Sequence, residues 1–462
     1  MRPRLNLCWA WFGLLIAAPA YAGQVHLYQL DLSPRDRLVT VRAEVAAGSL
    51  RARDGHVRDI KKLQSCDGVR LLPRSRDTRT LVLPDSTECL RYQIKLEPVQ
   101  ERWQQSLPSS MLLVSPSSFL WLPALGPDDE VRITLKIPDN YVLSVPWQQL
   151  AEDRWRIVGS PGSSRALMLL APSGSVRELE LPGLQKPAVF VPRHPQHTRY
   201  AGKIKTWLTR ALSSSAAPYP NPHLQILAID TPSRADASPV PFGHVIRDQG
   251  EAVRFFVDSQ RDLAALDYDW TAVHELAHPL LPYVDRRWIS EGFASYYQNV
   301  LQARRGEYSE QEMWRRLLRS FRRAGEVANM SPEQTETAEF WRARMMIYWA
   351  GAALALQQDV ALRQHHGQTL DRVLSQLARC CLPSQQTWRS TELMERLDQL
   401  SQTQVFSQLY QRVAYGNGMP DLGPLLRDLG VVEVDTDAVE MRDDAPLAEI
   451  RRRLTGAAAA AP

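Results

Sequence analysis

Two histidines spaced four residues apart constrain this 462-residue chain more than any other feature of its sequence. They belong to the run His274-Glu275-Leu276-Ala277-His278. On a helix, side chains four residues apart lie on the same face, so both imidazoles can bind one ion at roughly 2.0 to 2.1 Å. Glu275 lies about 100° round that helix, where its carboxylate can take a proton from water without binding the metal. The run therefore predicts a helix that carries half of a metal site and a general base.

A second segment offers a third ligand from outside the histidine helix. Residues 288–297 read Trp-Ile-Ser-Glu-Gly-Phe-Ala-Ser-Tyr-Tyr, and Glu291 lies at the predicted start of the next helix. Two histidines and a glutamate leave the fourth position of a zinc ion open, as catalytic sites require. We predict one Zn²⁺ per chain, bound by His274, His278 and Glu291. The competing interpretation is that both histidines are ordinary helix residues and that Glu291 is an acid favoured by the helix dipole.

These segments resemble the gluzincin metallopeptidases, in particular the glycyl aminopeptidase family and, more distantly, the aminopeptidase N family. The resemblance rests on the histidine run, on residues 288–297 and on the run Tyr348-Trp349-Ala350-Gly351. It implies that Tyr348 donates a hydrogen bond to the tetrahedral oxyanion. A phenol suits that role because a neutral donor can strengthen its bond as negative charge develops. The alternative is that Tyr348 is a packed helix residue.

The chain departs from these families on the strand before the histidine helix. Many members carry there a glycine-rich motif with a glutamate that holds the free amine of the substrate. Here residues 241–248 read Pro-Phe-Gly-His-Val-Ile-Arg-Asp, with no glutamate. Gly243 and His244 are the candidate substrate-binding residues, and Asp248 is a possible substitute for the missing acid. This departure predicts a peptidase that is not a strict aminopeptidase.

The connection between the two metal-binding segments is also short. Only twelve residues separate His278 from Glu291, fewer than in the aminopeptidase N pattern. Pro279 and Pro282 favour a loop rather than a helix in this interval. We expect the shorter connection to leave the cleft open to a long chain.

The N-terminus reads as a secretory signal. Arg2 and Arg4 precede an apolar stretch over residues 7–18, and Ala-Tyr-Ala at residues 20–22 matches a cleavage site. The stretch is too short to span a membrane as a helix. We expect a mature chain from Gly23 without a transmembrane segment, located in the periplasm or outside the cell.

Four cysteines follow the signal, and an oxidising compartment allows three pairings among them. Cys66 and Cys89 are the predicted pair, because they lie in one β-rich region. Their bridge would close a loop of about two dozen residues and contribute roughly 3 kcal/mol. Cys380 and Cys381 are adjacent, so both a strained bridge and two free thiols are possible.

The pattern along the chain predicts a multidomain α+β protein. After the signal, residues 23–184 form a β-rich, β-sandwich-like N-terminal region, with strands over residues 25–32, 38–45, 80–83, 91–96, 131–137 and 155–158. The resemblance implies a thermolysin-like gluzincin catalytic domain over residues 185–430, and the periodicity makes its C-terminal half mostly helical. Residues 431–462 read as a polar and Ala-rich tail. Its low-complexity end, from Arg451 to Pro462, has little to pack.

Local signals place the ends of the two metal-binding helices. Asp269 can cap a helix that begins at Trp270, and Ser290 can cap the helix that carries Glu291. Gly306 would end that second helix.

These residues predict hydrolysis of peptides or proteins by a zinc site in which Glu275 is the general base. Net charge is +4, and arginines are interspersed with acids, so we expect no nucleic-acid partner. Two alternatives remain at this point. The chain can be a non-catalytic peptide-binding or structural-zinc protein of the same fold, or a zinc hydrolase that acts on a non-peptide substrate.

Overall fold

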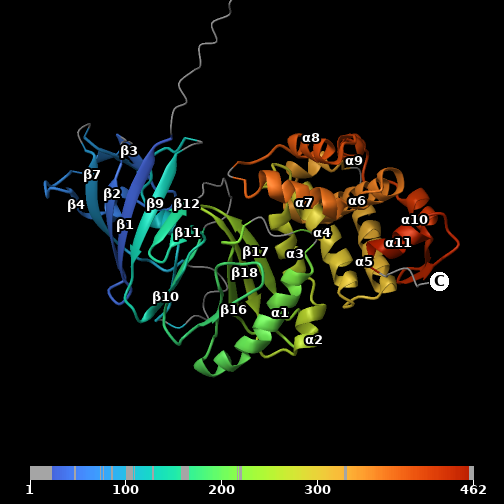
Figure 1. Cartoon of the computed structure of the whole chain (residues 1–462), viewed down its shortest axis with the longest axis horizontal. Coiled ribbons are helices and arrows are strands. Elements are labelled where there is room, and N and C mark those ends of the chain that lie inside the picture. The colour runs from blue at the N-terminus through green and yellow to red at the C-terminus, as the bar shows by residue number, and fades with distance from the viewer. Residues whose placement is uncertain are drawn as a thin grey trace, which may run out of the picture.

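The computed structural model describes residues 23–45, 48–72, 74–75, 77–84, 87–99, 108, 110–126, 129–157, 166–215, 217, 221–326, 330–384 and 386–456. The expected signal segment, residues 1–22, lies outside them. A β-rich N-terminal region, a central sheet and a helical C-terminal half follow one another along the longest axis of the molecule (Figure 1). The fold is the α+β class that the sequence predicts.

A seven-stranded sheet forms the outer part of the N-terminal region, in the order β11-β12-β9-β1-β2-β7-β4. Only β1 and β9 are parallel; the other neighbours are antiparallel. Burial alternates along β1, so that Leu30 is buried and Gln29 is exposed. The strands are β1 (Val25–Ser33), β2 (Leu38–Glu44), β4 (Lys61–Ser65), β7 (Cys89–Lys95), β9 (Glu130–Lys136), β11 (Gln148–Ala151) and β12 (Arg154–Ile157).

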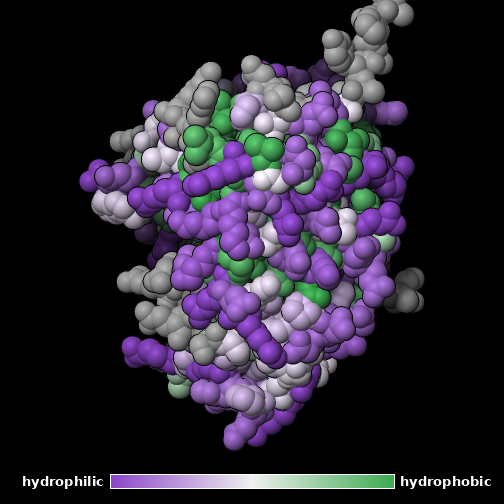
Figure 2. Space-filling model, turned by 90° about the vertical axis from the view of Figure 1, so that its left-hand side faces the viewer, coloured by the Kyte–Doolittle hydropathy of each residue, from purple (hydrophilic) through white to green (hydrophobic). Residues whose placement is uncertain are grey.

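Two three-stranded sheets complete this region. One has the order β3-β6-β5 and the other β10-β13-β8. Apolar side chains from all three sheets share one core with Trp121 and Trp147, so the region is sandwich-like. The opposite, solvent face of the N-terminal region is mostly hydrophilic (Figure 2). The strands are β3 (Ser49–Arg51), β5 (Arg74–Ser75), β6 (Thr80–Val82), β8 (Leu112–Val114), β10 (Tyr141–Ser144) and β13 (Met168–Pro172).

Two disulfides are present in the described residues. Cys66 and Cys89 are joined in the N-terminal region, with their Cα atoms 5.4 Å apart. The adjacent pair Cys380 and Cys381 is also joined, at the end of a helix, and this resolves the choice that the sequence left open.

A five-stranded mixed sheet links the two halves of the molecule, in the order β14-β15-β16-β18-β17. Its three inner strands are parallel, and both edge strands are antiparallel to their neighbours. One face packs on β8 and β13 of the N-terminal region, and the other packs on helices. The strands are β14 (Arg177–Leu179), β15 (Ala188–Val191), β16 (Gln225–Asp230), β17 (Phe242–Arg247) and β18 (Glu251–Val257).

Helices cover the second face of this sheet and make up the C-terminal half (Figure 1). None of the described helices combines the length and hydropathy needed to cross a lipid bilayer. The helices are α1 (Ala201–Ser213), α2 (Leu263–Tyr268), α3 (Thr271–Ala277), α4 (Arg287–Arg304), α5 (Glu310–Gly325), α6 (Phe340–His366), α7 (Leu370–Cys381), α8 (Ser390–Ser401), α9 (Val405–Ala414), α10 (Gly423–Leu429) and α11 (Ala448–Leu454), with 3₁₀ turns η1 (Val57–Asp59), η3 (Pro116–Ser118), η4 (Pro195–Tyr200), η5 (His278–Leu280) and η6 (Glu333–Glu336).

Residues 431–456, which the sequence assigns to a polar tail, pack against the helices. They form a hairpin of β19 (Val431–Asp435) and β20 (Ala438–Met441), followed by α11. Arg451 is only 1% exposed, and its guanidinium donates to Glu310 and to the carbonyl of Arg442. From the sequence alone, such a run of arginines is expected to be exposed to solvent. The carboxylate and carbonyl groups that accept hydrogen bonds from Arg451 belong to other segments of the chain. The alanine run beyond residue 456 lies outside the described residues.

Candidate metal centre and cleft

The histidine run lies on α3 and the turn that follows it. His274 and Glu275 belong to α3, and His278 is the first residue of the 3₁₀ turn η5. The helix begins at Thr271, one residue later than expected, and Asp269 accepts a 2.8 Å hydrogen bond from the Thr271 N–H. Both histidines are buried, at 2% and 8% exposure. A short helix thus holds two imidazoles on one buried face.

Glu291 comes from α4, but the expected cap of that helix is wrong. The helix begins at Arg287, so Ser290 lies inside its first turn rather than before it. The start is fixed by long-range contacts, because Arg287 interacts with Glu336 and with the carbonyl of Thr335. The end is as predicted, with Gly306 at a φ of 79° just after the helix.

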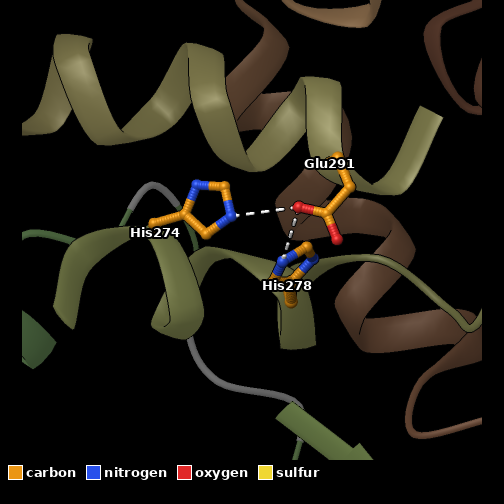
Figure 3. Close-up of side chains that lie close together, drawn as sticks. All are labelled: His274, His278 and Glu291. Carbon is orange, nitrogen blue, oxygen red and sulfur yellow. Dashed lines mark hydrogen bonds and ion pairs between the residues drawn. The ribbon is translucent and has the colours of Figure 1, made fainter. Parts of the chain in front are cut away.

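The three candidate ligands converge on one point (Figure 3). Their donor atoms all lie within 4.8 Å of one another. Nε2 of His274 lies 3.2 Å and Nε2 of His278 lies 3.6 Å from the same carboxylate oxygen of Glu291. Two imidazoles and one carboxylate are a donor set that suits zinc, so the residues present fit the predicted metal.

Two side chains of α4 orient the imidazoles from behind. Nδ1 of His274 donates a 2.7 Å hydrogen bond to the carboxamide oxygen of Gln298. Nδ1 of His278 lies 3.1 Å from the hydroxyl of Ser290. Because Nδ1 of His274 is a donor, Nε2 of the neutral ring carries the lone pair that faces Glu291, and Nε2 of the protonated ring donates to Glu291. Motif and spacing did not identify these two partners, although both lie on α4 at fixed offsets from Glu291.

The charges of the cluster are mutually stabilising. Burial by itself would raise the pKa of Glu291, but the charge of His278 and the hydrogen bond from His274 lower it well below its usual range. Burial would lower the pKa of His274, yet its bond to Glu291 and the nearby carboxylates raise it. The pocket therefore favours a carboxylate at position 291 and a more basic imidazole at position 274.

The side chain of Glu275 lies between its own helix, α3, and the edge strand β17. Burial raises the pKa of its carboxyl, while the charges of His274 and His278 and a hydrogen bond from the Val245 N–H oppose that rise. Gly243 leaves the room that this side chain occupies, since a Cβ there would lie 2.5 Å from Cγ of Glu275. Glu275 is thus held beside the metal-binding atoms, and it lines the same cleft.

Tyr348 of α6 reaches the same cleft, as the resemblance implies. Its ring stacks on His274 with centroids 5.8 Å apart. Burial raises the pKa of the phenol, and the charges of Glu291 and Glu275 raise it further. The phenol therefore stays protonated and remains a hydrogen-bond donor at ordinary pH.

The two candidate substrate-binding residues lie on β17 at the wall of the cleft. His244 lies within this edge strand. Asp248 lies beyond the strand, where its carboxylate accepts from the Ala166 N–H and pairs with Arg53 at 3.7 Å. Asp248 therefore faces the N-terminal region and does not line the cleft.

Solved structures share this architecture, although no family model and no curated protein matches the sequence. An aminopeptidase N family protein from Idiomarina loihiensis matches 88% of this chain and 78% of its own, with a TM-score of 0.58 and 15% identity. An M1 zinc metallopeptidase from Deinococcus radiodurans matches 87% of this chain and 94% of its own, with a TM-score of 0.50 and 15% identity.

The chain has the M1 metallopeptidase fold. At 15% identity, the two proteins share their fold with this chain. This fold agrees with the resemblance of the sequence to the gluzincins. Within this M1 fold, the described residues contain one set of three histidine, cysteine or acidic side chains close enough to bind a metal, namely His274, His278 and Glu291.

Proposed function

We propose that this chain is a zinc-dependent peptidase. One observation carries the proposal: the donor atoms of His274, His278 and Glu291 lie within 4.8 Å of one another, and Glu275 and Tyr348 line the same cleft. A structural zinc site has no need of an acid–base group and a phenol beside its ligands. The shared M1 fold supports the same conclusion.

Each of these residues has a separate role in the proposed reaction. His274, His278 and Glu291 would hold one zinc ion, which supplies Lewis-acid activation of water and of a carbonyl. Glu275 takes a proton from the attacking water and delivers it to the leaving amine. Tyr348 donates its phenolic hydrogen to the oxygen of the scissile carbonyl as negative charge develops there.

We further propose that cleavage does not need a free α-amine. The acidic side chains that line the cleft are Glu275, Glu291 and Asp285. The first two belong to the reaction site, and Asp285 already accepts from the Ser390 N–H and from Arg286. Burying an ammonium group without an acidic partner is unfavourable by several kcal/mol. An internal peptide bond is the better substrate for such a cleft.

Metal analysis tests the zinc site. The purified chain should bind one equivalent of zinc after reconstitution, and a chelator should abolish hydrolysis of a peptide panel. His274→Ala combined with His278→Ala should remove the zinc. Stoichiometric zinc in that double variant would overturn the ligand assignment, and chelator-resistant hydrolysis would overturn metal dependence.

The two glutamates can be separated by variants. Glu275→Gln should retain zinc and lose roughly 10² to 10⁴ in rate, because it removes a base and no ligand. Glu291→Gln should weaken zinc binding itself. Equal effects of both variants on zinc affinity would contradict the division of roles.

Two peptides of the same sequence, one with a free and one with an acetylated N-terminus, test the independence from the α-amine. Mass spectrometry should find both cut at the same internal bond. Cleavage of the free peptide alone, one residue from its N-terminus, would mean that the cleft does bind the amine.

We also propose a periplasmic or secreted location, on the basis of the signal pattern in residues 1–22. Mass analysis of the protein from the periplasm and culture medium should give a mature N-terminus at Gly23. Recovery of the intact chain from the cytoplasm alone would contradict this location.

A further inference from the structure

Three exposed aromatic side chains lie at or beside the proposed reaction site. They are Phe242, Trp270 and Phe340, which are 39, 40 and 46% exposed. Phe242 and Trp270 line the cleft itself. The ring of Phe340 lies 5.9 Å from the guanidinium of Arg287, which also lines the cleft. An exposed aromatic side chain loses the free energy that burial would supply, so a cluster of them at one site indicates a ligand that covers them.

The charged side chains at the cleft are already engaged within the protein. Arg247 donates to the carbonyls of His278 and Leu281. Arg287 interacts with Glu336, and Asp285 is held by Ser390. Apart from the reaction site itself, the cleft therefore offers a substrate aromatic surface rather than spare charge.

The aromatic residues flank the edge strand from both sides. Phe242 pairs with Phe256 and lies on the sheet face that packs toward the N-terminal region. A Cβ on Gly243 would point the other way, toward Thr271, and Trp270 immediately precedes that residue at the start of α3. The ring of Trp270 lies 5.3 Å from that of His274. Aromatic rings therefore lie on both faces of the sheet edge beside the candidate metal centre.

The outer side of β17 can accept an extended peptide. Among the strands of the described residues, this strand is at the end of its sheet and its neighbour is β18. A peptide added to such an edge bonds through its main chain and sends successive side chains to opposite faces. Neighbouring substrate side chains would then meet Phe242 on one face and Trp270 on the other.

We propose that the cleft selects extended polypeptide segments with bulky apolar side chains at adjacent positions. Folded proteins bury such segments and unfolded proteins expose them, so the substrate class is unfolded protein or its fragments. This inference rests on the proposed function, because it assigns a substrate class to the same site.

The test uses acetylated, internally quenched peptides that differ only in two central residues, Phe-Leu in one and Ser-Asn in the other. The zinc-loaded wild-type chain should show a kcat/KM at least about tenfold higher on the Phe-Leu peptide. Phe242→Ala and Trp270→Ala should each reduce the ratio of the two kcat/KM values several-fold. Zinc content and melting temperature are measured for each variant, since Trp270 touches His274.

Tyr415→Ala is the matched control. Tyr415 is 64% exposed and does not line the cleft, so its replacement should leave the ratio unchanged. A wild-type ratio near one, or variants that slow both peptides equally, would overturn the apolar preference. Failure of the wild-type chain to cut any peptide would instead overturn the proposed function.

Binding gives a second measurement that does not depend on turnover. Zinc-loaded Glu275→Gln should bind the Phe-Leu peptide at least about tenfold more tightly than the Ser-Asn peptide in fluorescence anisotropy. Adding Phe242→Ala should reduce that difference. Equal affinities for both peptides would overturn the inference even if both are cleaved.

Discussion

Gly292 and Gly351 meet backbone to backbone where α4 crosses α6. A Cβ on Gly351 would lie 2.0 Å from the carbonyl oxygen of Trp288, and a Cβ on Gly292 would lie 2.2 Å from Cα of Gly351. Glu291 directly precedes Gly292, and Tyr348 lies one turn before Gly351. The contact between the two glycines therefore brings the candidate metal ligand and the phenol to one cleft.

Gly351→Ala should destabilise the protein and separate these two residues. A methyl group cannot fit 2.0 Å from an oxygen, so α4 and α6 must move apart. Overpacking of this kind costs roughly 1 to 3 kcal/mol or more, which urea unfolding would measure. Gly202→Ala in α1 is the control, since its Cβ meets nothing within 4 Å and alanine favours the helix. Equal stability of the two variants would refute the close contact.

Gly243→Ala should impair activity without removing the metal. The new Cβ would lie 2.5 Å from Cγ of Glu275 and 2.9 Å from the side-chain methyl of Thr271. Glu275 must move, and a misplacement of about 1 Å can cost about 10²-fold in rate. Zinc content should stay at one equivalent while kcat/KM falls. A variant with wild-type rate would show that Glu275 tolerates displacement.

Gln298→Leu should weaken zinc binding although Gln298 is not a predicted ligand. The change removes the oxygen that accepts the hydrogen bond from Nδ1 of His274. Loss of such a partner typically costs about 10 to 100-fold in metal affinity, measurable by competition with a chelator of known affinity. Gln298→Glu keeps an acceptor at this position and should bind zinc at least as tightly as the wild-type chain. Unchanged affinity in Gln298→Leu would contradict the orienting role.

Lys186 makes stability depend on pH in the alkaline range. Burial lowers the pKa of its ammonium group to about 7, and the amine donates to the carbonyls of Val145 and Trp147. Below pH 7 both the folded and the unfolded chain carry this proton, so the cost of burying the charge is present in full. Between pH 7 and the ordinary pKa of lysine, the unfolded chain binds more protons than the folded chain, so the free energy of unfolding rises with pH.

Lys186→Met should remove this dependence. The difference in unfolding free energy between variant and wild type should favour the variant most near pH 6 and shrink by a few kcal/mol toward pH 10. Urea unfolding at several pH values measures it. A difference that stays constant with pH would show that Lys186 does not titrate in this range.

Several elements of the fold can be predicted from short stretches of sequence, because the residues within each stretch determine them. The alternation in residues 25–32 predicts β1, and the apolar run at 252–257 predicts the central strand β18. The spacing of His274 and His278 follows from helical geometry alone, so their convergence is predictable without any other part of the chain. The position of Ser290 was not predictable in the same way, since the contacts of Arg287 with Glu336 and Thr335 set the start of α4.

The sequence by itself determined the candidate residues of the site: the two histidines and the two glutamates follow from motif and spacing, and the tyrosine follows from the family resemblance. Only the tertiary structure decided which groups surround them. Asp248 is directed toward Arg53 and away from the cleft, Gln298 lies behind His274, and Phe242 and Trp270 come to flank one strand. The reason is physical, because motif spacing encodes contacts within one helix or strand, whereas these partners meet through packing between segments that are distant in the chain.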